Sequence, residues 1–172
     1  RFYDEVFPSL KTLTVPRPEA IELVDWAVSQ GWQIVIATNP LFPRKAIDHR
    51  LRWAGLPSEK YPFALVTSFE TSHFTKEIPA YYHEILGRLG WPEGPVIMVG
   101  DDPKMDVESA LLAGLPVFWI RPKGKSLPDL VNIPQGTIKD FRAWIQNVDI
   151  NTLQMDLNTP EALLSALQAT PA

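Results

Sequence analysis

Short apolar runs alternate with longer segments of helical periodicity along the chain. The runs are Gln33–Ala37, Phe63–Thr67, Val96–Val99 and Pro116–Ile120. Each is short enough and apolar enough to be a strand buried on both faces, as in a parallel sheet. The segment before each run begins near a proline and ends at a glycine, and the four glycines are Gly31, Gly55, Gly90 and Gly114. Strands that alternate with such helices are typical of βαβ crossovers, so the sequence predicts an α/β fold with a parallel sheet.

Composition excludes several classes of protein and site. The 172 residues suit one domain with a real core. A net charge of −4 gives no reason to expect a nucleic-acid partner, and the lack of cysteine excludes disulfides and thiolate metal sites. No apolar run approaches the roughly 20 residues of a membrane span. We therefore expect neither nucleic acid nor membrane as a partner, and a cytoplasmic location.

The run Val96–Val99 continues into a glycine and a cluster of acids, Gly100-Asp101-Asp102-Pro103-Lys104-Met105-Asp106. These acids follow the carboxyl end of a strand, where open α/β sheets place their ligands. Crowded carboxylates repel one another unless a cation holds them, and Mg²⁺ takes oxygen ligands of this kind. The same residues also suit a helix start, with Asp102 as N-cap and Pro103 as first helical residue. The two interpretations are compatible.

Two further strands lead to polar residues that suit phosphate chemistry. The strand at 33–37 ends in Thr38-Asn39, and the loop after the strand at 63–67 contains Lys76. All these strand ends face one edge of a parallel sheet. A hydroxyl and backbone amides suit a phosphate oxygen, and a lysine neutralises charge on a transferring phosphoryl group.

These three motifs, in this order and spacing, resemble the haloacid dehalogenase superfamily of phosphohydrolases from about Pro18 to Ile120. Ile34-Val35-Ile36-Ala37-Thr38-Asn39 is similar to the second motif of that family, Lys76 to the third, and Val99 to Asp106 to the fourth. The resemblance implies a three-layer α/β/α Rossmann-like sheet and a Mg²⁺-dependent phosphatase. It also implies phosphate binding by Thr38, Asn39 and Lys76, with Thr38 and Lys76 taking part in catalysis. The metal ligands would be Asp101 first, with Asp106 in support and Asp102 beside them.

Two departures from the family pattern stand out. Glu77 follows Lys76 where relatives usually have proline, which places a negative charge beside the lysine. The first motif, a strand ending D-x-D-x-T that supplies the aspartate nucleophile, has no counterpart in the chain. Asp4 has no strand before it, and Asp156-Leu157-Asn158-Thr159 is better explained as a helix cap than as a permuted motif. We therefore expect the nucleophile and its central strand to lie upstream of Arg1, and the neighbouring strands to expose unpaired edges without it.

The expected organisation has three parts. Residues 1–15 would be the tail of a helical cap, 16–121 the α/β core, and 122–172 a loop and helical extension. Within that extension Pro122–Thr137 reads as loop, Phe141–Val148 as a short helix, and Thr159 as the cap of one more helix. That last helix is a possible contact for a second copy of the chain.

Three functions are open at this point. The first is a phosphatase that acts on a small phosphorylated metabolite through an aspartyl-phosphate, in which case this chain alone would be inactive. The second is a binding or regulatory domain that has lost its nucleophile. The third is a dehalogenase. That reaction needs no metal, so the acid cluster of Asp101, Asp102 and Asp106 argues against it.

Overall fold

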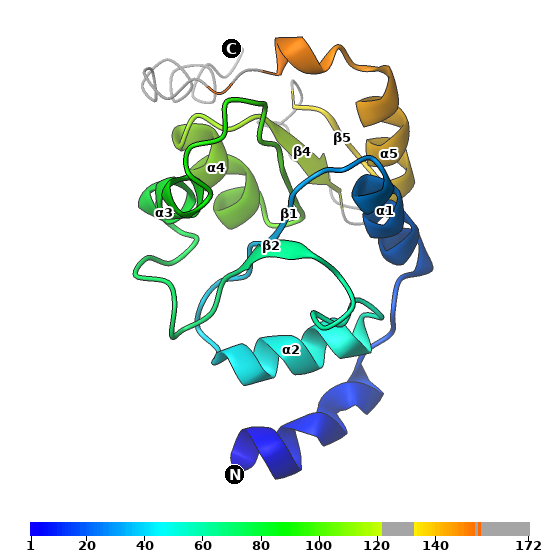
Figure 1. Ribbon diagram of the computed structural model, residues 1–172, viewed down its shortest axis with the longest axis vertical. Helices are drawn as coiled ribbons and strands as arrows, with labels where there is room; N and C mark the ends of the chain where they lie inside the picture. The colour runs from blue at the N-terminus through cyan, green and yellow to red at the C-terminus, as the bar shows by residue number, and fades with distance from the viewer. Residues whose placement is uncertain (122–132, 154, 156–172) are drawn as a thin grey trace, which may run out of the picture. The chain divides into compact units, whose positions relative to one another are not determined.

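The computed structural model describes residues 1–121, 133–153 and 155. By its internal contacts the chain divides into two compact units, Arg1–Thr75 and Lys76–Ala172. Figure 1 shows the elements of both units in sequence order by colour. None of the helices in the described residues is long and apolar enough to cross a membrane.

The first unit holds two parallel strands and the helices around them. Its elements are η1 (Phe2–Val6), η2 (Phe7–Leu13), α1 (Pro18–Ser29), β1 (Ile34–Ile36), α2 (Arg44–Trp53) and β2 (Phe63–Val66). β1 pairs with β2 in parallel, with Ile36 opposite Val66. Ile47 and Leu51 of α2 form a buried cluster with Val66 of β2. This packing fixes α2 against the strands whose carboxyl ends carry the candidate residues.

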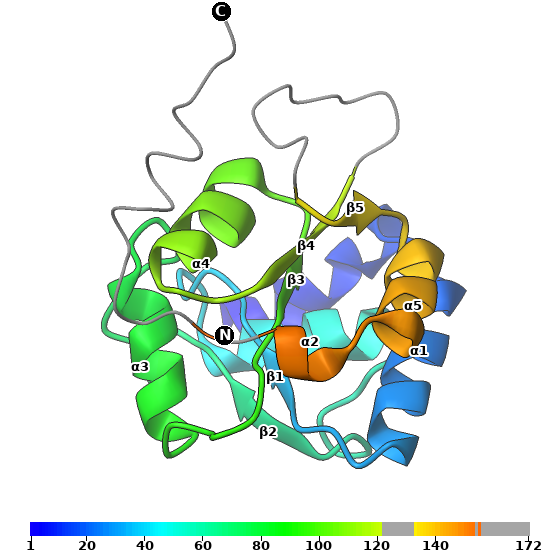
Figure 2. The ribbon, with the colours of Figure 1, turned by 90° about the horizontal axis from the view of Figure 1, so that it is seen from above.

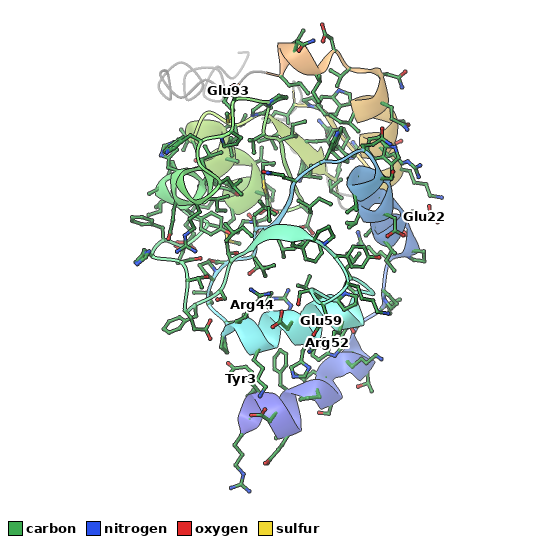
Figure 3. The ribbon with its side chains drawn as sticks, in the orientation of Figure 1. Tyr3, Glu22, Arg44, Arg52, Glu59 and Glu93 are labelled. Atoms are coloured by element: carbon green, nitrogen blue, oxygen red, sulfur yellow. The ribbon has the colours of Figure 1, made fainter. Side chains whose placement is uncertain are left out.

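Aromatic rings join the N-terminal helical segments to α2. Phe7 is buried and stacks on Trp53 with ring centroids 5.3 Å apart, and Tyr3 lies 5.4 Å from Phe7. The His49 ring of α2 meets the Tyr3 carbonyl oxygen at 3.1 Å. Figure 3 shows Tyr3 on the N-terminal segment facing α2. The segment is helical up to Leu13 and extended at Thr14.

The second unit holds three parallel strands. Its elements are α3 (Ala80–Arg88), β3 (Met98–Gly100), η3 (Pro103–Glu108), α4 (Ser109–Leu112), β4 (Val117–Ile120), β5 (Gln135–Gly136), α5 (Ile138–Asn147) and η5 (Ile150–Thr152). The strand order is β3-β4-β5, and β4 pairs with both neighbours in parallel.

Helices cover both sides of this second sheet. Figure 2 shows α3 and α4 on one side of it and α5 on the other. On the α5 side, Phe118 of β4 meets Phe141 and Trp144, with centroids 5.1 and 5.3 Å away. Trp119 of β4 is fully buried. The unit therefore has the helix–sheet–helix layering expected of the fold class.

All four predicted strands are confirmed, and so is the helix over Phe141–Val148, which the structure places at Ile138–Asn147. The prediction of loop for Pro122–Thr137 is wrong at Gln135 and Gly136, and residues 122–132 of that segment lie outside the described residues. Gln135 and Gly136 form β5, because their backbone pairs with Trp119 and Ile120 of β4. Two residues carry too little apolar periodicity to reveal a strand. The helix expected from Thr159 and the segment Asp156–Thr159 lie outside the described residues.

The first strand of each unit has one paired edge among the described residues. β1 pairs with β2, and β3 pairs with β4. The side chains of Ile34, Val35 and Ile36 in β1 are only half-buried, although all are apolar. The expectation that a central strand is missing beside them stays a prediction.

Candidate active site

The first unit supplies Thr38 and Asn39, which follow β1 directly. Thr38 is held by the buried Thr67 at the end of β2. The Thr38 N–H donates to Thr67 Oγ1 at 2.9 Å, and that hydroxyl lies 2.9 Å from the Thr38 carbonyl oxygen, which accepts from it. The Thr38 hydroxyl donates to the Thr67 carbonyl oxygen at the long distance of 3.5 Å. Thr67 therefore contacts both the backbone and the hydroxyl of Thr38.

The sequence analysis did not include Thr67 among the site residues. One signal could have found it, because Thr38 directly follows the run Gln33–Ala37 and Thr67 ends the run Phe63–Thr67. Two hydroxyls at the ends of adjacent parallel strands lie close enough to bond across the sheet.

The loop after β2 is fixed by its own polar side chains. The Ser68 hydroxyl is buried and lies 3.2 Å from the Thr71 hydroxyl. The Glu70 carboxylate accepts the backbone N–H of Arg44, the first residue of α2, at 2.8 Å. The hydrogen bond from Ser68, followed by the backbone N–H groups of Glu70 itself and Arg44, holds the pKa of the Glu70 carboxyl below its usual range. Glu70 thus serves as an anionic cap of α2, where the helix dipole favours negative charge.

The second unit supplies Lys76 and the acidic loop after β3. Lys76 and Asp106 are both buried, and the Lys76 ammonium donates to Asp106 Oδ1. Asp106 Oδ2 accepts the backbone N–H of Asp101 at 2.8 Å and that of Asp102 at 3.0 Å. The Asp106 carboxylate is therefore neutralised by the lysine and shapes the loop that carries the other two acids. Glu77, which follows Lys76, is exposed, and the carboxylate of the ion pair is that of Asp106.

Gly100 makes this arrangement possible. A Cβ at this position would lie 2.2 Å from Asp106 Oδ2 and 2.4 Å from its Cγ. The carboxylate reaches the backbone N–H groups only because residue 100 has no side chain.

Asp102 is the N-cap of η3. Its Oδ1 accepts the backbone N–H groups of Lys104 and Met105 at 2.9 and 2.8 Å, and Pro103 is the first helical residue. The predicted cap is confirmed. The carboxylates of Asp102 and Asp106 both accept hydrogen bonds from backbone N–H groups of their own loop. Of the three acids, Asp101 is the one that is exposed.

Two large side chains donate hydrogen bonds to the backbone of the loop after β3. Trp119 of β4 donates its indole N–H to the Asp101 carbonyl oxygen at 3.2 Å, and the Tyr82 hydroxyl of α3 donates to the Met105 carbonyl oxygen at 2.6 Å. Burial raises the pKa of the Tyr82 hydroxyl, and the charge of Asp106 adds to the rise. Neither residue could be assigned this role from the sequence, because tryptophans and tyrosines usually pack in cores.

The residues fit a divalent cation in part. Within the described residues, no three His, Cys, Asp or Glu side chains lie close enough together to hold a metal ion. Asp101 offers an exposed carboxylate on a loop whose geometry is fixed, which suits Mg²⁺ as one protein ligand. The assignment of Asp101, Asp102 and Asp106 as metal ligands stays a prediction, and so does the phosphate-binding role of Thr38, Asn39 and Lys76.

Comparison with known proteins identifies the family. The haloacid dehalogenase-like hydrolases match the chain over residues 3–114. The chain belongs to the haloacid dehalogenase-like hydrolase family. No curated protein matches it.

Solved structures support the fold of this haloacid dehalogenase-like chain. It is similar to a HAD phosphatase from Thermococcus onnurineus, with a TM-score of 0.67 and 23% identity over 83% of this chain and 64% of that one. It is also similar to the HAD-hydrolase YfnB from Bacillus subtilis, solved with magnesium, with a TM-score of 0.62, 22% identity, and coverage of 77% and 56%. A 2-haloacid dehalogenase from Pseudomonas syringae gives a TM-score of 0.57 and 23% identity over 75% and 52%. The chain thus spans less than two thirds of the length of these proteins.

Proposed function

We propose that the intact protein is a Mg²⁺-dependent phosphohydrolase that acts on a small phosphorylated metabolite through an aspartyl-phosphate. The observation that carries the proposal is the buried pair of Lys76 and Asp106 at the carboxyl end of β3. A buried ion pair adds little stability for the cost of removing its charges from water, so its position in the loop that follows β3 supports a functional role.

Each residue has a defined task in this proposal. Thr38, fixed by Thr67, presents its hydroxyl and the following backbone N–H groups to the phosphate. Lys76, held in place by Asp106, supplies positive charge to the phosphoryl group and to the attacking carboxylate. Asp101 would be the ligand to Mg²⁺, which neutralises phosphate charge when it is bound.

The attacking aspartate would come from outside these 172 residues. The sequence contains no D-x-D-x-T motif after an apolar strand. The relatives are longer than the stretch that this chain covers in them, with 64% of the Thermococcus onnurineus phosphatase matched. In the part of the chain that the structure describes, β1 and β3 each pair with a single strand, and an unpaired edge is a position that a further strand can occupy. By this proposal the chain alone is inactive.

Asp101→Asn tests the proposal in the intact protein. We expect phosphate release with Mg²⁺ to fall by about 100-fold or more, because the amide keeps the size of the side chain and removes its charge. Mg²⁺ affinity, measured by calorimetry, should fall as well. Glu93→Gln is the matched control, since Glu93 is an exposed acid of the same unit that lies before β3 (Figure 3). Equal activity of Asp101→Asn and the unaltered protein would exclude Asp101 as a metal ligand. Absence of any hydrolase activity in the unaltered protein would favour the binding or regulatory domain.

A further inference from the structure

Side chains of the second unit hold the two peptide groups that flank the Cα of Asp101. The Asp101 N–H donates to Asp106 Oδ2 at 2.8 Å, and the Asp102 N–H donates to the same oxygen at 3.0 Å. The Asp101 carbonyl oxygen, which belongs to the second of these peptide groups, accepts the indole N–H of Trp119 at 3.2 Å. Because peptide groups are planar, fixing both planes fixes φ and ψ of Asp101. The three hydrogen bonds therefore set the direction in which the Asp101 side chain leaves the backbone.

Trp119 reaches the Asp101 carbonyl oxygen from the neighbouring strand. β3 and β4 are parallel, and Trp119 lies opposite Gly100, the residue before Asp101. Successive side chains of a strand point to opposite faces of the sheet. Phe118 contacts the aromatic rings of α5, so Trp119 lies on the other face, which α3 and α4 cover (Figure 2). The register of the two strands thus brings the indole to the carboxyl end of β3.

The burial of Trp119 makes its hydrogen bond selective. Trp119 is fully buried, which is uncommon for a side chain of this size, and a buried indole N–H needs an acceptor. Its acceptor is the carbonyl oxygen of Asp101, the one exposed acid of the three in the loop after β3. An apolar side chain at position 119 could fill the same core but could not donate this bond. The indole N–H therefore acts on the residue proposed to bind Mg²⁺.

A fixed backbone at Asp101 has a consequence for a cation that the carboxylate binds. Ordering a flexible residue costs conformational entropy, and this cost lowers the affinity for any ligand that requires the ordering. In the folded protein the Asp101 backbone is already ordered by Asp106 on its N–H side and by Trp119 on its carbonyl side. Only the side-chain torsions of Asp101 then have to be fixed when the cation binds.

We infer that Trp119 is a positioning residue, which raises the affinity for Mg²⁺ by holding the backbone of Asp101. This inference rests on the proposed phosphohydrolase function and deepens its account of the metal site. Groups that orient a metal ligand without touching the metal typically change its affinity by about 10- to 100-fold. Trp119 makes no contact with substrate in this role and acts through Asp101 alone.

Trp119→Phe in the intact protein tests the inference, because it keeps an aromatic ring and removes the N–H donor. Calorimetry should show the Kd for Mg²⁺ rising about tenfold. The kcat for phosphate release at saturating Mg²⁺ should stay close to that of the unaltered protein. A smaller folded fraction would lower the calorimetric stoichiometry and leave the Kd unchanged, so the Kd separates positioning from stability. Trp144→Phe is the matched control, since Trp144 contacts the Phe118 ring on the α5 side and should leave the Kd unchanged.

Nuclear magnetic resonance of the unaltered protein gives a second test that does not depend on how a variant folds. The indole N–H signal of Trp119 should move when Mg²⁺ is added, because a cation on the Asp101 carboxylate alters the carbonyl group to which this N–H donates. Trp91 is the reference within the same unit. Its side chain is 51% exposed and precedes β3 in sequence, so its indole signal should stay in place.

The outcomes separate the inference from the function on which it rests. An unchanged Kd in folded Trp119→Phe, with Asp101→Asn still abolishing Mg²⁺ binding, would overturn the inference alone. An equal rise of the Kd in Trp144→Phe would assign the effect to general loosening of the unit and overturn it too. A Trp119 indole signal that stays in place while Mg²⁺ binds would contradict the coupling. If the unaltered protein binds no Mg²⁺, the proposed metal site fails and the inference fails with it.

Discussion

Lys76 and Asp106 form an ion pair in the interior of the second unit, where each side chain is 9% exposed. The lysine comes before α3 and the aspartate from η3, so the pair joins two segments thirty residues apart in sequence. Asp106 also accepts two backbone N–H groups, which gives the carboxylate a complete set of partners.

Lys76→Met should destabilise the protein. The methionine fits the volume of the lysine stem but leaves the Asp106 charge buried without its cation, which costs about 3 kcal/mol. Urea unfolding of the intact protein measures the change. Lys104→Met is the control, because Lys104 is exposed on η3 and should change the free energy of unfolding by less than about 0.5 kcal/mol. A similar small change for Lys76→Met would show that the pair is not formed.

Gly100→Ala should destabilise the protein by about 2 kcal/mol, because the added methyl overlaps the Asp106 carboxylate. The carboxylate would have to leave the N–H groups of Asp101 and Asp102. Gly94→Ala provides the comparison, since a Cβ there meets nothing within 4 Å and Gly94 lies in the same unit. Thermal unfolding of the two variants decides the point, and equal melting temperatures would contradict the geometry.

Thr67→Val should weaken both stability and phosphate binding. Valine keeps the shape of threonine but removes the hydroxyl that bonds to the Thr38 N–H and carbonyl oxygen. The loss of these bonds at the half-buried Thr38 costs about 1 kcal/mol. Thr67→Ser keeps the hydroxyl and should restore most of the lost affinity for methylphosphonate. If valine and serine behave alike in that measurement, Thr67 does not position Thr38.

Stability should decline in alkaline solution because of Tyr82. Its pKa in the folded protein lies above the ordinary value of 10.0, so folding favours the neutral hydroxyl. The contribution is complete below pH 10.0 and is lost as the pH rises above it, because the unfolded chain ionises first. Tyr82→Phe should flatten the fall in the free energy of unfolding between about pH 10 and 11.5. Tyr61→Phe serves for comparison, since Tyr61 is far less buried and its pKa is raised chiefly by a hydrogen bond to Asp25. An equally steep fall in Tyr82→Phe would exclude this cause.

The fold class could be predicted from the sequence because the apolar periodicity and the positions of proline and glycine indicate the same helices and strands along most of the chain. Apolar runs mark β1 to β4, and glycines such as Gly55 and Gly90 end helices with positive φ, as L-residues rarely can. β5 could not be predicted, because its two residues form a strand through pairing with β4 rather than through their own side chains.

The candidate site was predictable only in its residue types. The acid cluster and Lys76 stand out in the sequence. The pairing of Lys76 with Asp106 depends on how two segments thirty residues apart in sequence pack together, which the sequence does not reveal. Asp102 serves as a cap, a role that the Asp-Pro pair reveals. The Thr38–Thr67 bonds follow from the register of two strands, which sequence spacing does not specify.

Phosphate release tests the central claim most directly. The intact protein should release phosphate from a small phosphate monoester with Mg²⁺ and stop when the metal is chelated, while the 172-residue chain assayed beside it should release none. The claim would be contradicted by an intact protein that releases no phosphate under these conditions. Release by the 172-residue chain alone would equally contradict it, because the nucleophile would then lie within this sequence.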